Sequence, residues 1–416
     1  MCVKIRIVKL LPIFTINKSK LDLVNLIYRN IRIKGVTMAK EYKIEVDGLQ
    51  SIYLNGGSDI YNRKIDTYFC IPENGVNEET GIFTYICGFG GQADSNVCKK
   101  MRKEFADKHN LVTVQCNYFG YEFMQSADKV YLPDLSNYIG LNENDRKAIY
   151  ENGNFNLDKF LRICSEKEIE VNLDADLSLE NLSNFNDMGI MQALDNITAV
   201  LTVMNILYNN DFKFNARKNI LYGNSQGAYL AYLMNRLAPK LFSLIIDNSA
   251  WLYPNYLKKN SIRKLCLDLD NNVWLDFIYM AQKVVEDKQL LNLEYLYKDF
   301  NNTCNIISYH GVKDELISCE EKKWFCNNLE KCNYNEIGEE KVDGKIFKST
   351  RHGLDADFLE LFNSTMESLS FSFEKSLNFD LPSQVEITTE KYNYYIDYEE
   401  VMPKVYIKSK SEGNYV

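Results

Sequence analysis

The sequence GNSQG at 223–227 points most directly to chemistry. It has the form G-x-S-x-G and stands between an apolar run expected to be a strand (219–225) and a run with helical spacing (228–239). A serine on such a strand-to-helix turn is held in a strained backbone, close to the unpaired N–H groups at the start of the helix. Gly and Ser are also common in ordinary turns. Because of the strand–turn–helix context, we interpret Ser225 as a candidate nucleophile.

The chain contains three histidines, so a mechanism that needs one must use His109, His310 or His352. A serine hydroxyl becomes a useful nucleophile when a histidine takes its proton. His352 follows an expected strand (343–350) and precedes the last expected helix, which makes it our candidate base. We expect His109 to be a solvated or capping residue at a helix end, and His310 to shape the loop that carries the acid.

A carboxylate must orient the histidine, and Asp314 is the first candidate for that acid. It lies in the loop HGVKDELI, directly after an expected strand, so the candidates occur in the chain order Ser225, Asp314, His352. This order is typical of one class of serine hydrolases built on alternating strands and helices. Asp247, in the expected strand 242–250, is the alternative acid.

Acyl transfer also requires hydrogen-bond donors for the oxyanion that forms on the carbonyl oxygen. The main-chain N–H of Gln226, directly after the serine, is one candidate. The other should come from the glycine-rich loop CGFGGQ (87–92), where Phe89 is our first choice and Gly90 the second. The alternative interpretation of this loop is a flexible turn without such a role.

The elements that must position these residues form an alternating series. Apolar or alternating runs predict strands at 42–46, 64–71, 83–89, 111–119, 219–225, 242–250, 304–314 and 343–350, and helical spacing predicts helices at 95–109, 188–208, 228–239, 320–331 and 354–373. Such alternation predicts a mainly parallel sheet covered on both faces, with ligands bound beyond the carboxyl ends of the strands. Two insertions interrupt the series: 121–186, and a mostly helical cap at 251–303.

Residues from about 42 to 373 resemble the α/β-hydrolase superfamily, with GNSQG, CGFGGQ, HGVKDELI and RHGLD in family order. The resemblance implies an α/β-hydrolase fold with a helical cap, and a serine esterase or acyltransferase whose triad requires no cofactor. The stretches GFGGQADSN and GNSQGAYLAYL are also similar to a hydrolase-like family of flagellated epsilon-class bacteria, which implies a role near flagellar or surface-glycan modification. The sequence departs from the commonest pattern where Cys87, rather than His, precedes Gly88.

The expected substrate is a small-molecule or glycan acyl ester, and the cap should cover it. Five aromatic residues of the second insertion are candidates for that cap: Trp251, Tyr253, Tyr256, Trp274 and Phe277. Aromatic side chains can pack against either an apolar acyl chain or a sugar ring, so they do not indicate which of the two the substrate contains. Packing within the insertion is the expected role for most of them.

Charge and organisation exclude several classes of function. The net charge of −9 argues against a nucleic-acid partner, and no uninterrupted apolar stretch approaches the roughly 20 residues of a membrane span. Residues 1–37 carry a local charge of +7, which leaves −16 for the remainder. We interpret this segment as a translated extension before a start at Met38, with a membrane-surface anchor or a docked element as alternatives. The hydrolase domain is expected at 38–373, with a Tyr-rich tail at 374–416.

The eleven cysteines include no CxxC pair and no close Cys/His cluster, which argues against a metal site. Several stand in apolar strand-like runs, where they are expected to be small buried hydrophobic residues: Cys70, Cys87, Cys116 and Cys304. This usage favours a reduced, cytoplasmic protein.

Two alternatives from other classes remain. The loop at 88–93 matches G-x-G-x-x-A, but the next expected strand ends in NYF (117–119) rather than in the acidic residue that a dinucleotide site requires. The other alternative is a non-catalytic interaction protein on the same fold, in which the insertions and the tail form a partner surface.

Overall fold

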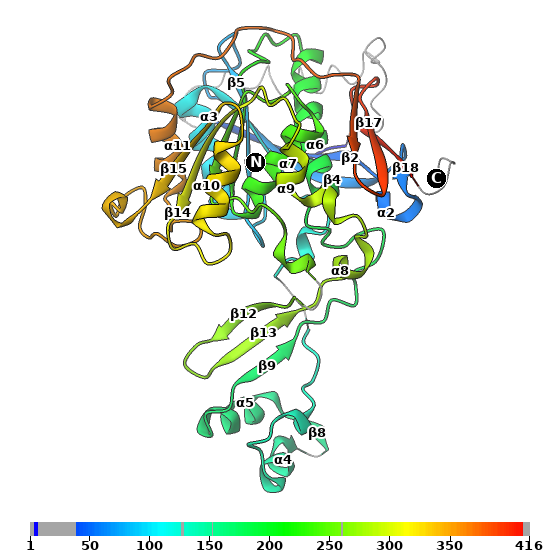
Figure 1. The fold of residues 1–416 in the computed structure, drawn as a ribbon, viewed down its shortest axis with the longest axis vertical. Coiled ribbons are helices and arrows are strands. Elements are labelled where there is room, and N and C mark those ends of the chain that lie inside the picture. The colour runs from blue at the N-terminus through cyan, green and yellow to red at the C-terminus, as the bar shows by residue number, and fades with distance from the viewer. Residues whose placement is uncertain (1–3, 7–38, 126–128, 152, 259–260, 411–416) are drawn as a thin grey trace.

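The computed structural model describes residues 4–6, 39–125, 129–151, 153–258 and 261–410, and its centre is a nine-stranded sheet (Figure 1). β4 runs antiparallel to β2 and β6, whereas the strands from β6 to β15 are parallel to one another. This arrangement confirms the expected mainly parallel sheet. In spatial order the strands are β1 (Lys4–Arg6), β2 (Lys40–Leu49), β4 (Tyr61–Ile71), β6 (Leu111–Cys116), β5 (Gly81–Ile86), β10 (Asn219–Asn224), β11 (Leu244–Asn248), β14 (Asn305–Gly311) and β15 (Cys332–Ile337).

Helices cover both faces of the sheet, and this is why its central strands are apolar throughout. On one face, Phe83 of β5 packs against Phe105 of α3 (Asn96–His109) and Phe362 of α11 (Phe358–Glu367), with ring centroids 4.8 and 4.7 Å apart. On the other face lie α6 (Ile190–Asn209), α7 (Gln226–Leu237) and α10 (Cys319–Asn327); Tyr232 of α7 contacts Phe325 of α10 at 5.5 Å.

The helix α6 is the longest apolar element in the described part of the chain. By length and composition alone it is a candidate to cross a membrane, and 89% of its apolar window is buried inside the protein. Its side chains pack in the core beside α7 and the sheet, as expected for the central helix of a layered fold.

The two insertions come together in one arm that projects from the sheet (Figure 1). β9 (Val171–Asp174), from the first insertion, pairs in parallel with β13 (Val273–Phe277), which pairs antiparallel with β12 (Arg263–Asp268). The expectation that 251–303 is mostly helical is therefore wrong. The arm also contains α4 (Glu143–Ile149), β7 (Tyr150–Glu151), β8 (Asn154–Phe155) and α5 (Leu157–Glu166), and the second insertion continues into α8 (Ala281–Val284) and α9 (Leu293–Tyr297).

The Tyr-rich tail adds strands to the protein. β16 (Gln384–Thr388), β17 (Tyr392–Asp397) and β18 (Lys404–Ser409) form an antiparallel sheet that is completed by β3 (Gly57–Ser58), beside α2 (Ile52–Asn55). The Tyr394 hydroxyl donates to Asp287 Oδ2 at 2.9 Å, which ties the tail to the second insertion. Of the basic segment 1–37, only the strand β1, parallel to β2, lies among the described residues.

In the segment before the last histidine, one expected strand is wrong and one strand was missed. Residues 343–350 form a loop, because Asp343 Oδ1 accepts hydrogen bonds from the N–H groups of Lys345, Ile346 and Phe347 at 2.8–3.0 Å and bends the chain. The last strand of the sheet is instead β15, whose half-exposed edge position allows polar residues and hides its apolar pattern.

We predict that Phe362→Ala lowers the free energy of unfolding by about 3–5 kcal/mol, because it opens a cavity between α11 and the sheet. Urea denaturation followed by circular dichroism measures the effect. Trp324→Ala on α10 is the control, since that aromatic side chain is exposed, and its effect should stay near 0.5 kcal/mol or less. Equal losses of unfolding free energy in both variants would mean that Phe362 does not pack α11 against this face of the sheet.

Candidate functional site

Ser225 lies at the tight turn between β10 and α7, with φ 55° and ψ −119°. A positive φ is costly for a residue with a side chain, so this turn is strained as the sequence predicts. The main-chain N–H of Ser225 donates to the carbonyl oxygen of Asn248 at 2.8 Å and fixes the turn to the next strand. A Cβ on Gly227 would collide with the carbonyl oxygen of Ile86, so only glycine allows α7 to approach β5 this closely.

The structure brings the three residues of the expected triad together. His352 Nε2 lies 2.7 Å from Ser225 Oγ, and His352 Nδ1 lies 2.7 Å from Asp314 Oδ2. With Nδ1 donating to the carboxylate, Nε2 is left to accept the serine proton. Although burial raises the pKa of Asp314, the hydrogen bond and charge attraction of His352, together with the charge of His310 and the N–H of Leu316, hold that pKa below its usual value.

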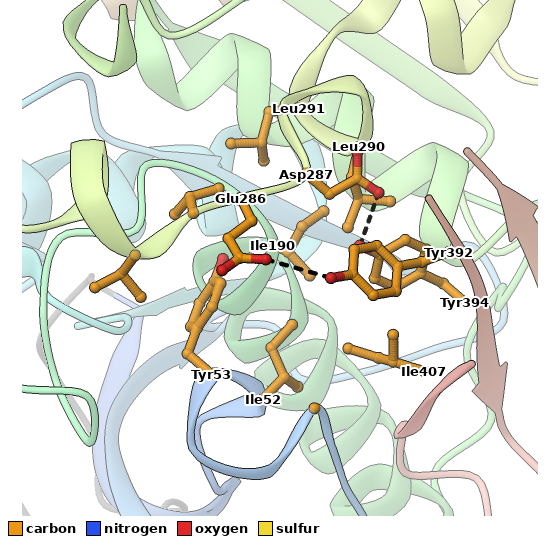
Figure 2. A pocket seen from close by; sticks show the side chains of 13 residues that line it. Ile52, Tyr53, Ile190, Glu286, Asp287, Leu290, Leu291, Tyr392, Tyr394 and Ile407 are labelled. Atoms are coloured by element: carbon orange, nitrogen blue, oxygen red, sulfur yellow. Dashed lines mark hydrogen bonds between the residues drawn. The ribbon is translucent and has the colours of Figure 1, made fainter. Parts of the chain in front are cut away.

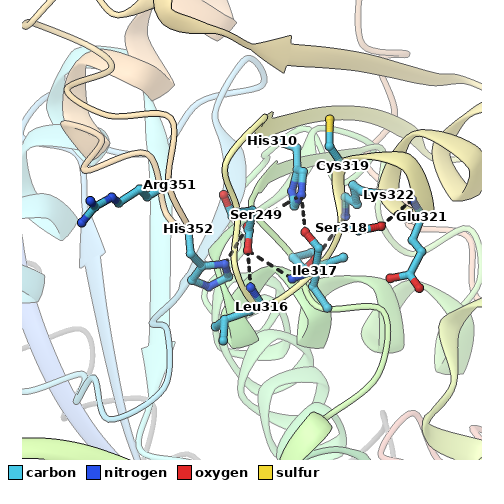
Figure 3. A network of polar contacts seen from close by, with 12 residues as sticks. Ser249, His310, Leu316, Ile317, Ser318, Cys319, Glu321, Lys322, Arg351 and His352 are labelled. Atoms are coloured by element: carbon cyan, nitrogen blue, oxygen red, sulfur yellow. Dashed lines mark hydrogen bonds and ion pairs between the residues drawn. The ribbon is translucent and has the colours of Figure 1, made fainter.

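The loop that carries the acid is held by its own hydrogen bonds (Figure 3). Asp314 Oδ1 accepts from the N–H groups of Leu316 and Ile317 at 2.8 and 3.1 Å. The fully buried His310 donates from Nε2 to the carbonyl oxygen of Ile317 at 3.0 Å, and burial lowers its pKa. In this structure His310 therefore braces the acid loop, which leaves His352 as the histidine in contact with the serine.

Asp247, the alternative acid, is engaged elsewhere. Its carboxylate lies 2.7 Å from Lys322 Nζ and accepts from the hydroxyls of Tyr232 and Ser308 at 2.9 and 2.8 Å. Both members of the ion pair are fully buried. Asp247 thus links β11 to α10 beneath the site.

His109 is the last residue of α3, at the helix end where the sequence places it, but its side chain is half-buried rather than solvated. Its Nε2 lies 2.7 Å from Asn363 Oδ1, and its ring meets the edge of Phe362. The sequence missed this contact because 254 residues separate His109 from Asn363.

The candidate oxyanion donors lie beside the serine. Gly88 and Phe89 line the same pocket as Ser225. The N–H of Gly90 donates to Met124 Sδ at 3.1 Å and so has a partner already. Within the described residues, the structure gives the N–H groups of Phe89 and Gln226 no acceptor, which favours these two as donors.

A pocket of about 320 Å³ opens next to Ser225 and His352. Two of the five candidate cap aromatics, Trp251 and Tyr256, line it, and their rings lie 5.6 Å from that of Phe89. The others are not among its lining residues. The second insertion also contributes Arg263 to this pocket, a residue that no sequence pattern singled out.

A second pocket, of about 220 Å³, lies between α2, α6, the second insertion and the tail (Figure 2). Tyr53, Glu286, Asp287, Tyr392 and Tyr394 are among its lining residues, and none of the sequence-predicted site residues is. Across the part of the chain that is described, no group of three or more His, Cys, Asp or Glu is placed to hold a metal ion. The buried cysteines are as expected: Cys70, Cys87, Cys116 and Cys304.

The strand order and the strained serine turn define an α/β-hydrolase fold. Within it, the chain belongs to the family described as "Protein of unknown function (DUF2920)", whose model matches residues 62–260 and 279–399. The unmatched interval, residues 261–278, contains the whole of β12 and β13. The narrower resemblance to a family of flagellated epsilon-class bacteria stays a prediction. No match was found among curated proteins.

Several solved structures are similar to the chain. Est1E from Butyrivibrio proteoclasticus with bound ferulic acid is 15% identical, over 73% of this chain and 93% of that chain, with a TM-score of 0.40. An acylaminoacyl peptidase from Pyrococcus horikoshii is 14% identical, over 84% of this chain and 44% of that chain, with a TM-score of 0.42. Esterase 2 from Thermogutta terrifontis, phosphonylated by sarin, is 11% identical, over 77% of this chain and 91% of that chain, with a TM-score of 0.38. The fold is therefore assigned from the strand order and the serine turn of this chain, and not from these structures.

We predict that Lys322→Met destabilises the protein by about 3–5 kcal/mol, because it leaves the buried Asp247 carboxylate without its cation. Lys323→Met is the matched control on the same helix, since Lys323 is half-exposed and its pair with Glu336 should contribute no more than about 1 kcal/mol. Chemical denaturation of the two variants measures the difference. Losses of similar size would show that the buried pair is not what ties α10 to the sheet.

Proposed function

We propose that the protein is a serine esterase or acyltransferase that acts on the ester of a small molecule or a glycan. The observation that supports this most is the spacing of Ser225, His352 and Asp314, with 2.7 Å on each side of the imidazole. The strained serine turn and the adjoining pocket add to it. These features are what nucleophilic acyl transfer requires: an activated hydroxyl, an oriented base and room for the acyl group.

In the proposed reaction Ser225 Oγ attacks the ester carbonyl carbon while His352 Nε2 takes the hydroxyl proton. Asp314 keeps the imidazole in the required tautomer and stabilises the charged form. The carbonyl oxygen becomes an oxyanion and receives hydrogen bonds from the N–H groups of Phe89 and Gln226. His352 then gives its proton to the leaving alcohol, and the acyl group remains on Ser225.

The second half of the reaction repeats these roles with a new nucleophile. Water or an acceptor hydroxyl loses a proton to His352 and attacks the acyl carbonyl, which releases Ser225. Water gives an esterase and an acceptor hydroxyl gives an acyltransferase. The triad requires no metal or cofactor for either outcome. The proposal also includes a glycan ester as the substrate, a role near flagellar or surface-glycan modification, and a cytoplasmic location.

We predict that Ser225→Ala and His352→Ala each lower kcat for a 4-nitrophenyl ester by at least about 1,000-fold, because each removes a member of the triad. Steady-state kinetics on the purified proteins measure the effect. Ser368→Ala is the control, since Ser368 is exposed at the end of α11 and should keep wild-type rates.

Labelling with a fluorophosphonate probe makes the test independent of the ester chosen. Wild-type protein should be labelled on Ser225, and the Ser225→Ala variant should not be labelled. Folded wild-type protein that neither reacts with the probe nor turns over the ester would overturn the proposal and favour the non-catalytic interaction protein. Labelling at Ser225 without ester turnover would support Ser225 as the nucleophile and show that the 4-nitrophenyl ester is not a substrate.

A further inference from the structure

Arg263 is a charged side chain in the same pocket as Ser225 and His352. It is the first residue of β12, in the interval that the family model does not match. Its guanidinium lies over the rings of Phe89 and Tyr256, with its central carbon 4.9 and 5.4 Å from their centroids. Two rings that contact the guanidinium in this way restrict its movement and keep its orientation in the pocket.

The groups that accept hydrogen bonds from the Arg263 guanidinium are neutral. Nη1 donates to the Tyr256 hydroxyl at 2.8 Å and Nη2 donates to Gln125 Oε1 at 2.7 Å. Nε–H is buried and has no acceptor within the described residues. A guanidinium has five N–H donors, so further donors remain for a ligand.

Arg63 is half-buried and Arg102 is buried, and each pairs with a carboxylate, whereas the half-buried Arg236 donates to the main-chain carbonyl oxygens of Leu296 and Glu386. Arg63 Nη2 lies 2.6 Å from Asp195 Oδ1, and Arg102 pairs with Glu41. In the described ranges, no carboxylate lies within 4.0 Å of Arg263. Arg263 is half-buried, so its charge is partly withdrawn from water, and such a charge without a counterion in a pocket favours an anionic ligand.

We infer that Arg263 binds a carboxylate of the substrate, so that the ester carries one negative charge in addition to its ester bond. This inference rests on the proposed function and names its substrate class. The planar fork of a guanidinium matches the two oxygens of a carboxylate. A monoanion fits the charges of the pocket better than a phosphate dianion does, since the lining includes one arginine and also Asp355, which is exposed at its edge.

The placement of Arg263 separates its role from that of the triad. Within the described residues its hydrogen bonds go to Tyr256 and Gln125 rather than to Ser225, His352 or Asp314, and its guanidinium lies over the ring of Phe89 in the oxyanion loop. We therefore expect Arg263 to select the substrate rather than to take part in the transfer of the acyl group or the proton.

Two pairs of esters test the inference, and each pair differs in one charge. The acyl-side pair is mono-4-nitrophenyl glutarate and its methyl ester, and the alcohol-side pair is 4-acetoxybenzoate and its methyl ester. In wild-type protein, kcat/KM for the charged member of at least one pair should exceed that for the neutral member by about 10- to 100-fold, as a charge-assisted hydrogen bond allows. The preference should fall as salt is added.

Arg263→Gln should abolish this preference, so that kcat/KM falls by about 10- to 100-fold more for the charged esters than for the neutral ones, and Arg263→Lys should keep part of the preference. Lys264→Gln is the matched control, because Lys264 is the next residue of β12 and its Nζ lies 2.6 Å from Asn172 Oδ1, outside the pocket lining. This control should keep the wild-type preference.

The outcomes separate the inference from the proposed function. Wild-type protein that hydrolyses both members of each pair equally, or an Arg263→Gln variant that keeps the preference, would overturn the inference and leave the serine esterase standing. An equal loss on charged and neutral esters in Arg263→Gln would also overturn it, since it would assign Arg263 to holding the cap. Folded wild-type protein that neither reacts with the fluorophosphonate probe at Ser225 nor turns over any of these esters would overturn the proposed function itself.

Discussion

The backbone of Ser225 is the constraint on which the site depends. A positive φ at a serine costs about 1–3 kcal/mol, so the surroundings must enforce it. Two features do so: the hydrogen bond from Ser225 N–H to Asn248, and the close approach of α7 to β5 at Gly227. The buried faces of β10 and α7 supply the packing energy that offsets the strain. Because the turn ends a central strand, the serine hydroxyl is presented at the carboxyl edge of the sheet, where the other two side chains also arrive.

Two aspartates near that edge differ in role because they have different partners. Asp247, in β11, faces a buried lysine and two hydroxyls, and it holds α10 against the sheet. Asp314, in the loop after the neighbouring strand β14, faces His352 and two main-chain N–H groups. The sequence contains both carboxylates at strand ends, and only the packing of α10, which brings Lys322 under β11, decides between them. The fully buried His310 then keeps the loop of Asp314 in place.

Local patterns predicted the elements that are fixed locally. The apolar runs of β5, β6 and β10 and the spacing of α6 and α7 are properties of neighbouring residues, so the sheet and the place of Ser225 could be predicted from sequence. The predictions that failed concern contacts between distant segments, or elements whose residues are half-exposed. Residues 343–350 contain apolar residues such as Phe347, which is buried although it lies in a loop, and they therefore resemble a strand. β15, at the edge of the sheet, lacks a clear apolar pattern. The pairing of β9 with β13 joins segments about 100 residues apart, which no periodicity reveals, and Arg263 was missed for the same reason.

The division between core and insertions has a chemical consequence. Ser225, Asp314 and His352 lie in segments that the family model matches, whereas Arg263 lies in the hairpin that it does not match. The pocket is thus built by segments that the family model matches, including Trp251 and Tyr256, and by a hairpin that it does not match. The core sets the positions of the reacting groups, and the arm contributes charge and aromatic surface above them through Trp251, Tyr256 and Arg263. Since Gln125 of the first insertion also accepts from Arg263, both insertions determine where that charge lies. A change in either insertion can therefore alter which ester is selected while the serine turn keeps its geometry.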